Sequence, residues 1–179
     1  EGFKTDKLKI MGLQLKKTTI PKPISKKLSD FIDNLLDGTP WGEIGDSIVI
    51  YKEALAKAEN ITEIGLPKGI KKLEHYTNEY KTDNGTRLPG HVSASIFWNI
   101  CCDQFNDTES PRIVSGMKIK TYYLKSQFGR FKSIAIPTDI KILPKWFDKF
   151  INIIDVDAQI QRLVDKPLLN IVKAIGEDI

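Results

Sequence analysis

The sequence predicts an α+β fold that is mainly helical and contains a small antiparallel sheet. Several stretches repeat apolar residues at intervals of three and four positions, which is the period of an amphipathic helix. Three shorter stretches, near residues 61–66, 117–125 and 133–137, carry the alternation or bounding prolines of short strands. With 179 residues, of which 41% are hydrophobic, the chain can bury a substantial core in one domain or subdomain.

The first half of the chain predicts two helices, a strand and a long connection. Residues 26–38 repeat apolar side chains at helical spacing, and Gly38 is well placed to end that helix. A second helix is expected from position 42 or 47 to position 60. The strand near 61–66 stops at Pro67. The polar stretch 68–89, which contains the turn signal Asp-Asn-Gly, predicts a long connection.

The second half predicts a buried helix, a hairpin and further helices. Residues 91–103 are rich in apolar side chains and follow a Pro-Gly pair. The strands 117–125 and 133–137 are joined by a connection that contains Gly129 and is typical of a hairpin. A helix is expected after Pro144. One or two more are expected over 155–176, with an interruption at Pro167.

Composition sets the class of protein. No apolar run approaches the roughly 18 residues of a membrane span, and the N-terminal residues lack the apolar region of a signal peptide. Because the sequence does not begin with Met, we expect it to be a piece of a longer or processed protein. Cys101 and Cys102 are the only cysteines and are adjacent, which argues against a disulfide framework and favours a reducing cytoplasm.

Charge is distributed in blocks along the chain. Residues 1–27 hold eight lysines and only two acids, whereas residues 28–66 hold eight acids and only two lysines. Residues 118–149 are again basic, with eight cationic residues and two acids. This pattern predicts one basic face and one acidic face. A solvated surface without a specific role is the alternative reading of each block.

Few residues suggest catalysis or metal binding. Asp155 and Asp157 could bind a divalent metal, but they stand directly before a helical stretch, where Asp caps a helix or stabilises its first turn. The two histidines and the adjacent cysteine pair lack the spacing of a zinc site. A Cys–His nucleophilic pair stays open, although the cysteines lie in a helix expected to be buried. No glycine-rich phosphate-binding motif or nucleophile elbow is present.

Two basic stretches could contact nucleic acid. The first, before Pro21, combines lysines with hydroxyl residues, which suits phosphate oxygens. The second follows the first predicted strand and combines three lysines with a glycine that allows close approach. Either stretch could instead be a solvated loop. The residues concerned are Lys16, Lys17, Thr18 and Thr19 in the first stretch, and Lys68, Gly69, Lys71 and Lys72 in the second.

Four segments together resemble a known family. The stretch KLKIMGLQLKKTTIPKPISKKL, starting at Lys7, resembles the palm–thumb junction of B-family replicative DNA polymerases, especially those of T-even-type phages. RLPGHVSASIFWN is similar to the PFHIRG-type segment of that family, and SPRIVSGMKIKTYYL to its V-x-x-G-x-K-V-Y-V-L strand. FGRFKSIAIPTDI resembles the segment with FGDK and a following IAWP. The resemblance spans about residues 7–170.

The resemblance implies a mainly helical polymerase thumb, with residues 1–20 as the palm–thumb junction and residues 21–179 as the thumb domain. A thumb grips the primer–template duplex from the minor-groove side and takes part in DNA replication. By position, Lys16, Lys17, Thr18 and Thr19 would lie near the primer-strand backbone. The segment with Lys68, Gly69, Lys71 and Lys72 would belong to the tip that straddles the duplex, together with Arg87 and His91.

The resemblance also implies what the chain lacks. The catalytic aspartates and their Mg²⁺ belong to the palm, so no cofactor is expected in this chain and it should not polymerise alone. The expected partners are primer–template DNA and a palm and fingers portion, in the same polypeptide or as a separate chain. The implied location is the cytoplasm of a phage-infected bacterium, with no membrane partner.

Two departures from the family limit what the resemblance implies. Gln14 stands where the junction commonly has Glu, so an ion pair made by that Glu is not carried over. The C-terminus lacks the aromatic and acidic peptide that binds the sliding clamp, so clamp binding is not carried over either. Two other classes of protein remain as alternatives: a protein-interaction module that uses the acidic face of residues 28–66, and a small enzyme that uses Asp155 and Asp157.

Overall fold

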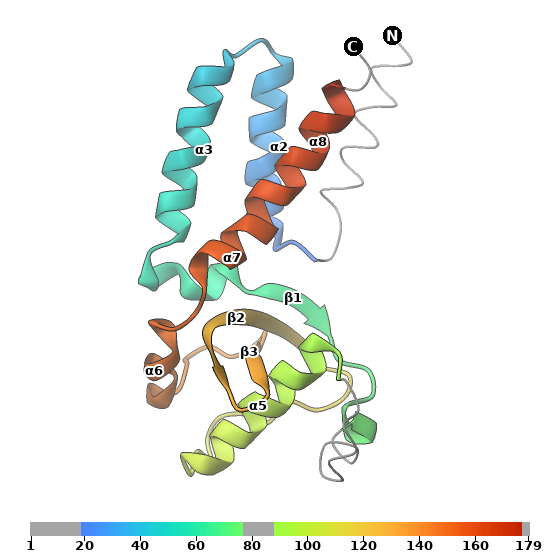
Figure 1. Cartoon of the computed structure of the whole chain (residues 1–179), viewed down its shortest axis with the longest axis vertical. Coiled ribbons are helices and arrows are strands. Elements are labelled where there is room, and N and C mark those ends of the chain that lie inside the picture. Colours follow the sequence, from blue (N-terminus) through green and yellow to red (C-terminus); the bar gives the residue numbers. More distant parts are fainter. Residues whose placement is uncertain (1–18, 77–87, 177–179) are drawn as a thin grey trace. The chain divides into compact units, whose positions relative to one another are not determined.

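The structure is a computed structural model that describes residues 19–76 and 88–176 (Figure 1). The chain divides into two compact units. Among the described residues, the helical unit comprises residues 19–64 and 156–176, and the sheet unit comprises residues 65–76 and 88–155. The predicted class is confirmed, because the chain is mainly helical and contains a three-stranded antiparallel sheet. Among the residues described, no helix is long and apolar enough to cross a membrane.

The helical unit begins with a helical hairpin. Helix α2 spans Lys22–Leu36 and follows Pro21, whose fixed φ suits the residue before a first turn. It buries one face, and the chain turns after it through Gly38, whose φ of 96° is readily adopted only without a side chain. Helix α3 spans Trp41–Leu55 and packs against α2. The buried residues of α2 are Ile24, Leu28, Phe31 and Ile32, which confirms the predicted apolar spacing.

The helical unit ends with a nearly continuous helix of three parts. Helix α7 spans Val156–Ile160, a π-helical turn, η3, spans Gln161–Asp165, and α8 spans Lys166–Gly176. The sequence predicts an interruption at Pro167, but α8 includes that residue, and the irregular turn ends two residues before it, at Asp165. Proline cannot donate to the carbonyl four residues earlier and crowds it. A wider π turn relieves that conflict without ending the helix.

The predicted strand near 61–66 is wrong. Residues Ala58–Ile64 form a 3₁₀ segment, η1, and the strand β1 spans Leu66–Gly69. Ile61 and Ile64 are both buried, and their spacing of three residues is the 3₁₀ period. The strand includes Pro67, which is compatible with β1 because it is an edge strand. The second predicted helix also ends earlier than expected, at Leu55 rather than near position 60.

The sheet unit is built on the strand order β1-β2-β3, with antiparallel pairs throughout. Strand β2 spans Lys118–Phe128 and β3 spans Phe131–Pro137, so the predicted hairpin is confirmed. Gly129 takes a positive φ of 58° in its turn. Helix α5, Gly90–Gln104, packs against β3 as the predicted buried helix. Two short helices, η2 (Lys145–Phe147) and α6 (Asp148–Ile151), follow Pro144.

An aromatic cluster fills the core of the sheet unit. Phe97 of α5 stacks on Phe131 of β3, with ring centroids 4.6 Å apart and planes nearly parallel. Trp98 is fully buried against Trp146, with centroids 5.1 Å apart. Its indole N–H donates to the Pro111 carbonyl at 2.9 Å, so the buried donor is satisfied. These contacts join α5 to β3 and to the short helix η2.

Candidate nucleic-acid interface

The second basic stretch forms a well-anchored loop in the sheet unit, which we call the basic loop, residues 68–72. Its lysines, Lys68, Lys71 and Lys72, are exposed, whereas Ile70 is only 2% exposed. The Ile70 N–H donates to the Met117 carbonyl at 3.0 Å, and the Ile70 carbonyl accepts from the Gly116 N–H at 2.7 Å. The loop therefore presents its cations on a backbone that is fixed at its centre.

A second set of contacts fixes the C-terminal end of the basic loop. Leu73 is buried, and its N–H donates to the Ser115 hydroxyl oxygen at 2.8 Å. The same hydroxyl donates to the carboxylate of Glu74 and lowers the pKa of that group. Because Leu73 and Ile70 point inward, the lysines between and before them point outward. The loop thus presents lysine ammonium groups of the kind that contact phosphate oxygens.

Strand β2 and helix α5 add polar groups beside the basic loop. Lys118 is exposed and lies directly opposite Gly69 in the antiparallel register. His91 lies in the first turn of α5, and burial and the charge of Lys68 lower its pKa. The imidazole is therefore neutral at pH 7 and can act as a hydrogen-bonding group rather than a cation. Nothing lies within 4 Å of where a Gly69 side chain would start, so a ligand backbone can approach closely there.

The structure does not describe every predicted site residue. Lys16, Lys17, Thr18 and Arg87 lie outside the described residues. Thr19 is exposed in the turn before α2, in the helical unit. The predicted residues that the structure brings together are those of the sheet unit: Lys68, Gly69, Lys71, Lys72 and His91.

A basic stripe that the sequence reading missed runs along the end of the helical unit. Arg162, Lys166, Asn170 and Lys173 are all exposed and follow one another at intervals of four, four and three residues. Such intervals place them on one helix face, over roughly 16 Å at 1.5 Å per residue. The opposite face of α8 is buried through Leu168 and Ile171. The intervals are visible in the sequence, but a helix expected to break at Pro167 would not keep the residues before and after it in line.

The candidate catalytic residues lie at the start of a helix or in the core, where their roles are structural. Asp157 lies in the first turn of α7, and Asp155 immediately precedes that helix, where carboxylates stabilise the N-terminus. Cys101 and Cys102 are buried in α5, and burial raises their pKa values to about 12 and about 11. Both thiols are therefore protonated at neutral pH and are poor nucleophiles. Within residues 19–76 and 88–176, no group of three or more His, Cys, Asp or Glu side chains could hold a metal ion.

Comparison with known proteins does not assign the chain to a family. No family model matches the sequence, and no curated protein is significantly similar to it.

Proposed function

We propose that the chain is the C-terminal thumb of a B-family DNA-directed DNA polymerase that holds the primer–template duplex during replication. The observation that carries the binding role is the basic loop, whose three lysines point outward from a backbone fixed through Ile70 and Leu73. The assignment to a polymerase comes from the four sequence segments that resemble T-even-type phage polymerases and follow one another in the same order. The α8 stripe provides a further surface of the same chemistry.

The chemistry of these residues favours the nucleic-acid backbone over the bases. Lysine ammonium groups neutralise phosphates as point charges, and contacts of this kind carry no sequence information. Gly69 leaves room for a phosphate to approach, and neutral His91 can donate or accept a hydrogen bond beside it. Duplex binding of this type is sequence-independent, which suits a polymerase that must follow any template.

Catalysis belongs to a partner in this proposal. Asp155 lies directly before α7 and Asp157 in its first turn, where carboxylates stabilise a helix, and these positions favour a chain that neither incorporates nucleotides nor degrades DNA alone. Mg²⁺ is expected in the palm, which together with the fingers forms the catalytic portion, in the same polypeptide or in a separate chain. The proposed location is the cytoplasm of a phage-infected bacterium. Primer extension with Mg²⁺ or Mn²⁺ tests the catalytic claim, and extension abolished by Asp155→Asn or Asp157→Asn would contradict it.

Salt-dependent duplex binding tests the binding role. Fluorescence anisotropy with a labelled duplex should give a dissociation constant in the weak non-specific range, roughly 10⁻⁴–10⁻⁶ M at physiological salt. Replacing the lysines at 68, 71 and 72 together by Ala should weaken binding and reduce the salt slope by up to about 2.7, at about 0.9 per lost phosphate contact. The matched control replaces three other exposed lysines of the same unit: Lys132, Lys141 and Lys145. Equal losses in the two variants would mean that the basic loop is only a solvated loop.

A second candidate function rests on the acidic hairpin of the helical unit. Helix α3 exposes Ile50 by 66%, and the helical period places the exposed acids Glu43, Asp46 and Glu53 on the same side of the helix. Trp41, 57% exposed, is the first residue of the helix. Exposed apolar residues of this size are typical of protein-interaction surfaces. A protein-interaction module with this acidic surface would bind a basic protein rather than DNA. Absence of salt-dependent duplex binding in the unmodified chain would favour it over the thumb.

A further inference from the structure

Helix α3 exposes two neighbouring aliphatic side chains on the side that faces away from the core of the helical unit. Val49 is 53% exposed and Ile50 is 66% exposed, whereas Ile44 and Leu55 of the same helix are buried. Aliphatic side chains this open contribute little to the core of the unit. Neighbouring exposed apolar residues are typical of a surface that binds another protein.

One acid lies at each end of this apolar pair. Asp46 precedes Val49 by three residues, and Glu53 follows Ile50 by three. Both acids are exposed, and within the described residues neither side chain has a hydrogen-bonding or ionic partner. Lys52, the one lysine of α3, is instead paired with Asp165 of η3 at 2.9 Å. The surface formed by Asp46, Val49, Ile50 and Glu53, which we call the α3 face, therefore carries uncompensated negative charge at both ends.

The α8 stripe repeats the same intervals with the opposite charge. Lys166 and Lys173 are exposed and seven residues apart, as Asp46 and Glu53 are, and within the described residues neither lysine has an ionic partner. Leu169, 52% exposed, lies between the two lysines on the same side of the helix. At 1.5 Å per residue, the two charges of each helix are about 10 Å apart along its axis. When α3 and α8 lie side by side, both acids can therefore meet lysines across a shared apolar centre.

Within one copy of the chain, the α3 face and the α8 stripe do not meet. Both helices belong to the helical unit (Figure 1), where their buried sides pack inward and these two surfaces stay open to solvent. The lysines of the stripe can therefore neutralise the acids of the α3 face only on another molecule. A second copy of the chain is a partner whose charges and intervals both match.

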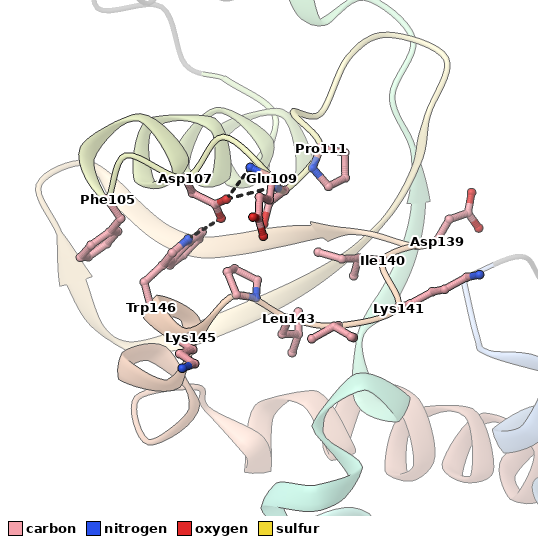
Figure 2. A pocket seen from close by; sticks show the side chains of 13 residues that line it. Phe105, Asp107, Glu109, Pro111, Asp139, Ile140, Lys141, Leu143, Lys145 and Trp146 are labelled. Atoms are coloured by element: carbon pink, nitrogen blue, oxygen red, sulfur yellow. Dashed lines mark hydrogen bonds between the residues drawn. The ribbon is translucent and has the colours of Figure 1, made fainter.

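The groove of the sheet unit does not show this complementarity. It lies between the turn after α5 and the segment after β3 (Figure 2). Two acids, Glu109 and Asp139, and two lysines, Lys141 and Lys145, are among the residues that line it. The charges of the groove therefore favour no partner of one sign, in contrast to the α3 face.

We propose that copies of the chain associate through the α3 face of one copy and the α8 stripe of the other. The two acids face the two lysines, and Leu169 packs between Val49 and Ile50. Each copy carries one surface of each sign, so the contact forms twice in a closed dimer or repeats along an open chain. One pair of helices buries less surface than a stable interface, so the association is weak and reversible. The lysines cannot contact phosphates at the same time, so this association belongs to the chain without DNA.

Sedimentation velocity of the full chain without DNA tests the proposal. The average sedimentation coefficient should rise as the protein concentration increases from micromolar to millimolar, and added salt should reverse the rise because it screens exposed ion pairs. The variant Asp46→Lys with Glu53→Lys should stay monomeric. The matched control, Asp30→Lys with Asp33→Lys, makes the same change of charge at exposed acids of α2 and should associate like the unmodified chain.

Mixing two charge-reversed variants gives the sharper test. Lys166→Glu with Lys173→Glu should also be monomeric alone. In an equal mixture with the variant in which Asp46 and Glu53 are replaced by lysine, each basic surface meets an acidic one, so association should return. Circular dichroism establishes that both variants keep their helices.

Three outcomes would overturn the proposal: a chain that stays monomeric at millimolar concentration, a mixture that does not regain association, or a control variant that loses association equally. A monomeric chain whose α3 amide signals shift with a lysine-rich helical peptide would likewise overturn it, because the partner is then another protein. The proposal goes beyond DNA binding, and a failure to bind duplex would leave all these results unchanged.

Discussion

Gly65 lies directly against the hydroxyl group of Tyr122. A Cβ atom added at Gly65 would stand 2.8 Å from the Tyr122 oxygen and 2.6 Å from the Cβ of Lys120. Tyr122 is only 1% exposed and packs edge-on to Phe147, so its ring has little freedom to move aside. The glycine is therefore required by close approach where the chain enters β1.

Replacing Gly65 by Ala should destabilise the sheet unit by about 1–3 kcal/mol, the usual cost of overpacking. Urea unfolding followed by amide exchange across β2 measures the loss in that unit. Gly45→Ala is the matched control, because nothing lies within 4 Å of its added methyl and it stands inside α3. The control should be more stable than the unmodified chain by roughly 0.5–1 kcal/mol. A Gly65→Ala protein of unchanged stability would refute the packing argument.

The buried hydroxyl group of Tyr122 should lower the stability of the folded chain. It is buried and has no hydrogen-bond partner in the described structure, and an unsatisfied buried polar group costs about 1–3 kcal/mol. Tyr122→Phe keeps the ring and removes that cost, so the variant should unfold at higher urea concentration than the parent. A loss of stability in the phenylalanine variant would indicate that the hydroxyl has a partner.

The substitution Tyr122→Phe should also change how the stability of the chain depends on pH. Burial raises the pKa of Tyr122 above its ordinary value of 10.0. The unfolded chain then loses the phenolic proton at a lower pH than the folded chain, so stability is complete below pH 10 and falls as pH rises beyond it. Tyr122→Phe should show a shallower fall in melting temperature between about pH 9 and pH 11. Parallel curves for the two proteins would argue against a buried phenol.

The spacing of apolar residues predicted α2 correctly, because its buried face is formed by residues that lie close together in the sequence. It failed for the segment 61–66, where the β-branched residues Ile61, Thr62 and Ile64 favour a strand but the spacing of three between the two buried isoleucines fits a 3₁₀ turn. What decides between the two is the packing of those side chains in the unit, which a short window does not contain. The position of β1 depends on pairing with β2, more than fifty residues later.

The candidate interface was predictable in composition but not in geometry. The cluster of lysines at 68–72 was evident, but its anchors, Met117 and Ser115, lie more than forty residues away. The α8 stripe was missed for a different reason. A proline usually ends a helix, and Pro167 is instead accommodated by a π turn that keeps Arg162 and Lys166 on one face.

Stability in acid should depend on Asp107. Hydrogen bonds from Ser110, and then from Trp146 and Glu109, lower the pKa of Asp107 from 3.8 to about 2. Above pH 4 the carboxylate is ionised in both the folded and the unfolded chain, so its contribution is complete. As pH falls from about 4 to about 2 the unfolded chain is protonated first, and that stability is lost.

The variant Asp107→Asn tests this contribution of the carboxylate to stability. It should lower the melting temperature at pH 6 and flatten its fall between pH 4 and pH 2, since no carboxylate remains to titrate. Tryptophan fluorescence reports the transition because Trp146 is one partner. Asp139→Asn is the control, at an exposed carboxylate that forms no hydrogen bond in the described structure, and it should keep the parent profile. Equal effects of the two variants would assign the acid sensitivity to overall charge.

The α8 stripe should contribute to duplex binding independently of the basic loop. Lys166→Ala with Lys173→Ala removes two exposed cations while sparing the buried face formed by Leu168 and Ile171, so the helix should remain folded. If both lysines contact phosphates, the salt slope should fall by about 1.8, equally for duplexes of different sequence. Lys132→Ala with Lys145→Ala removes the same charge elsewhere and controls for general electrostatics. Circular dichroism establishes that both proteins keep their helices. If the stripe variant binds DNA like the control variant, this face of α8 is only solvated. If only the basic-loop variant loses affinity for DNA, the sheet unit is the DNA-binding part of the chain.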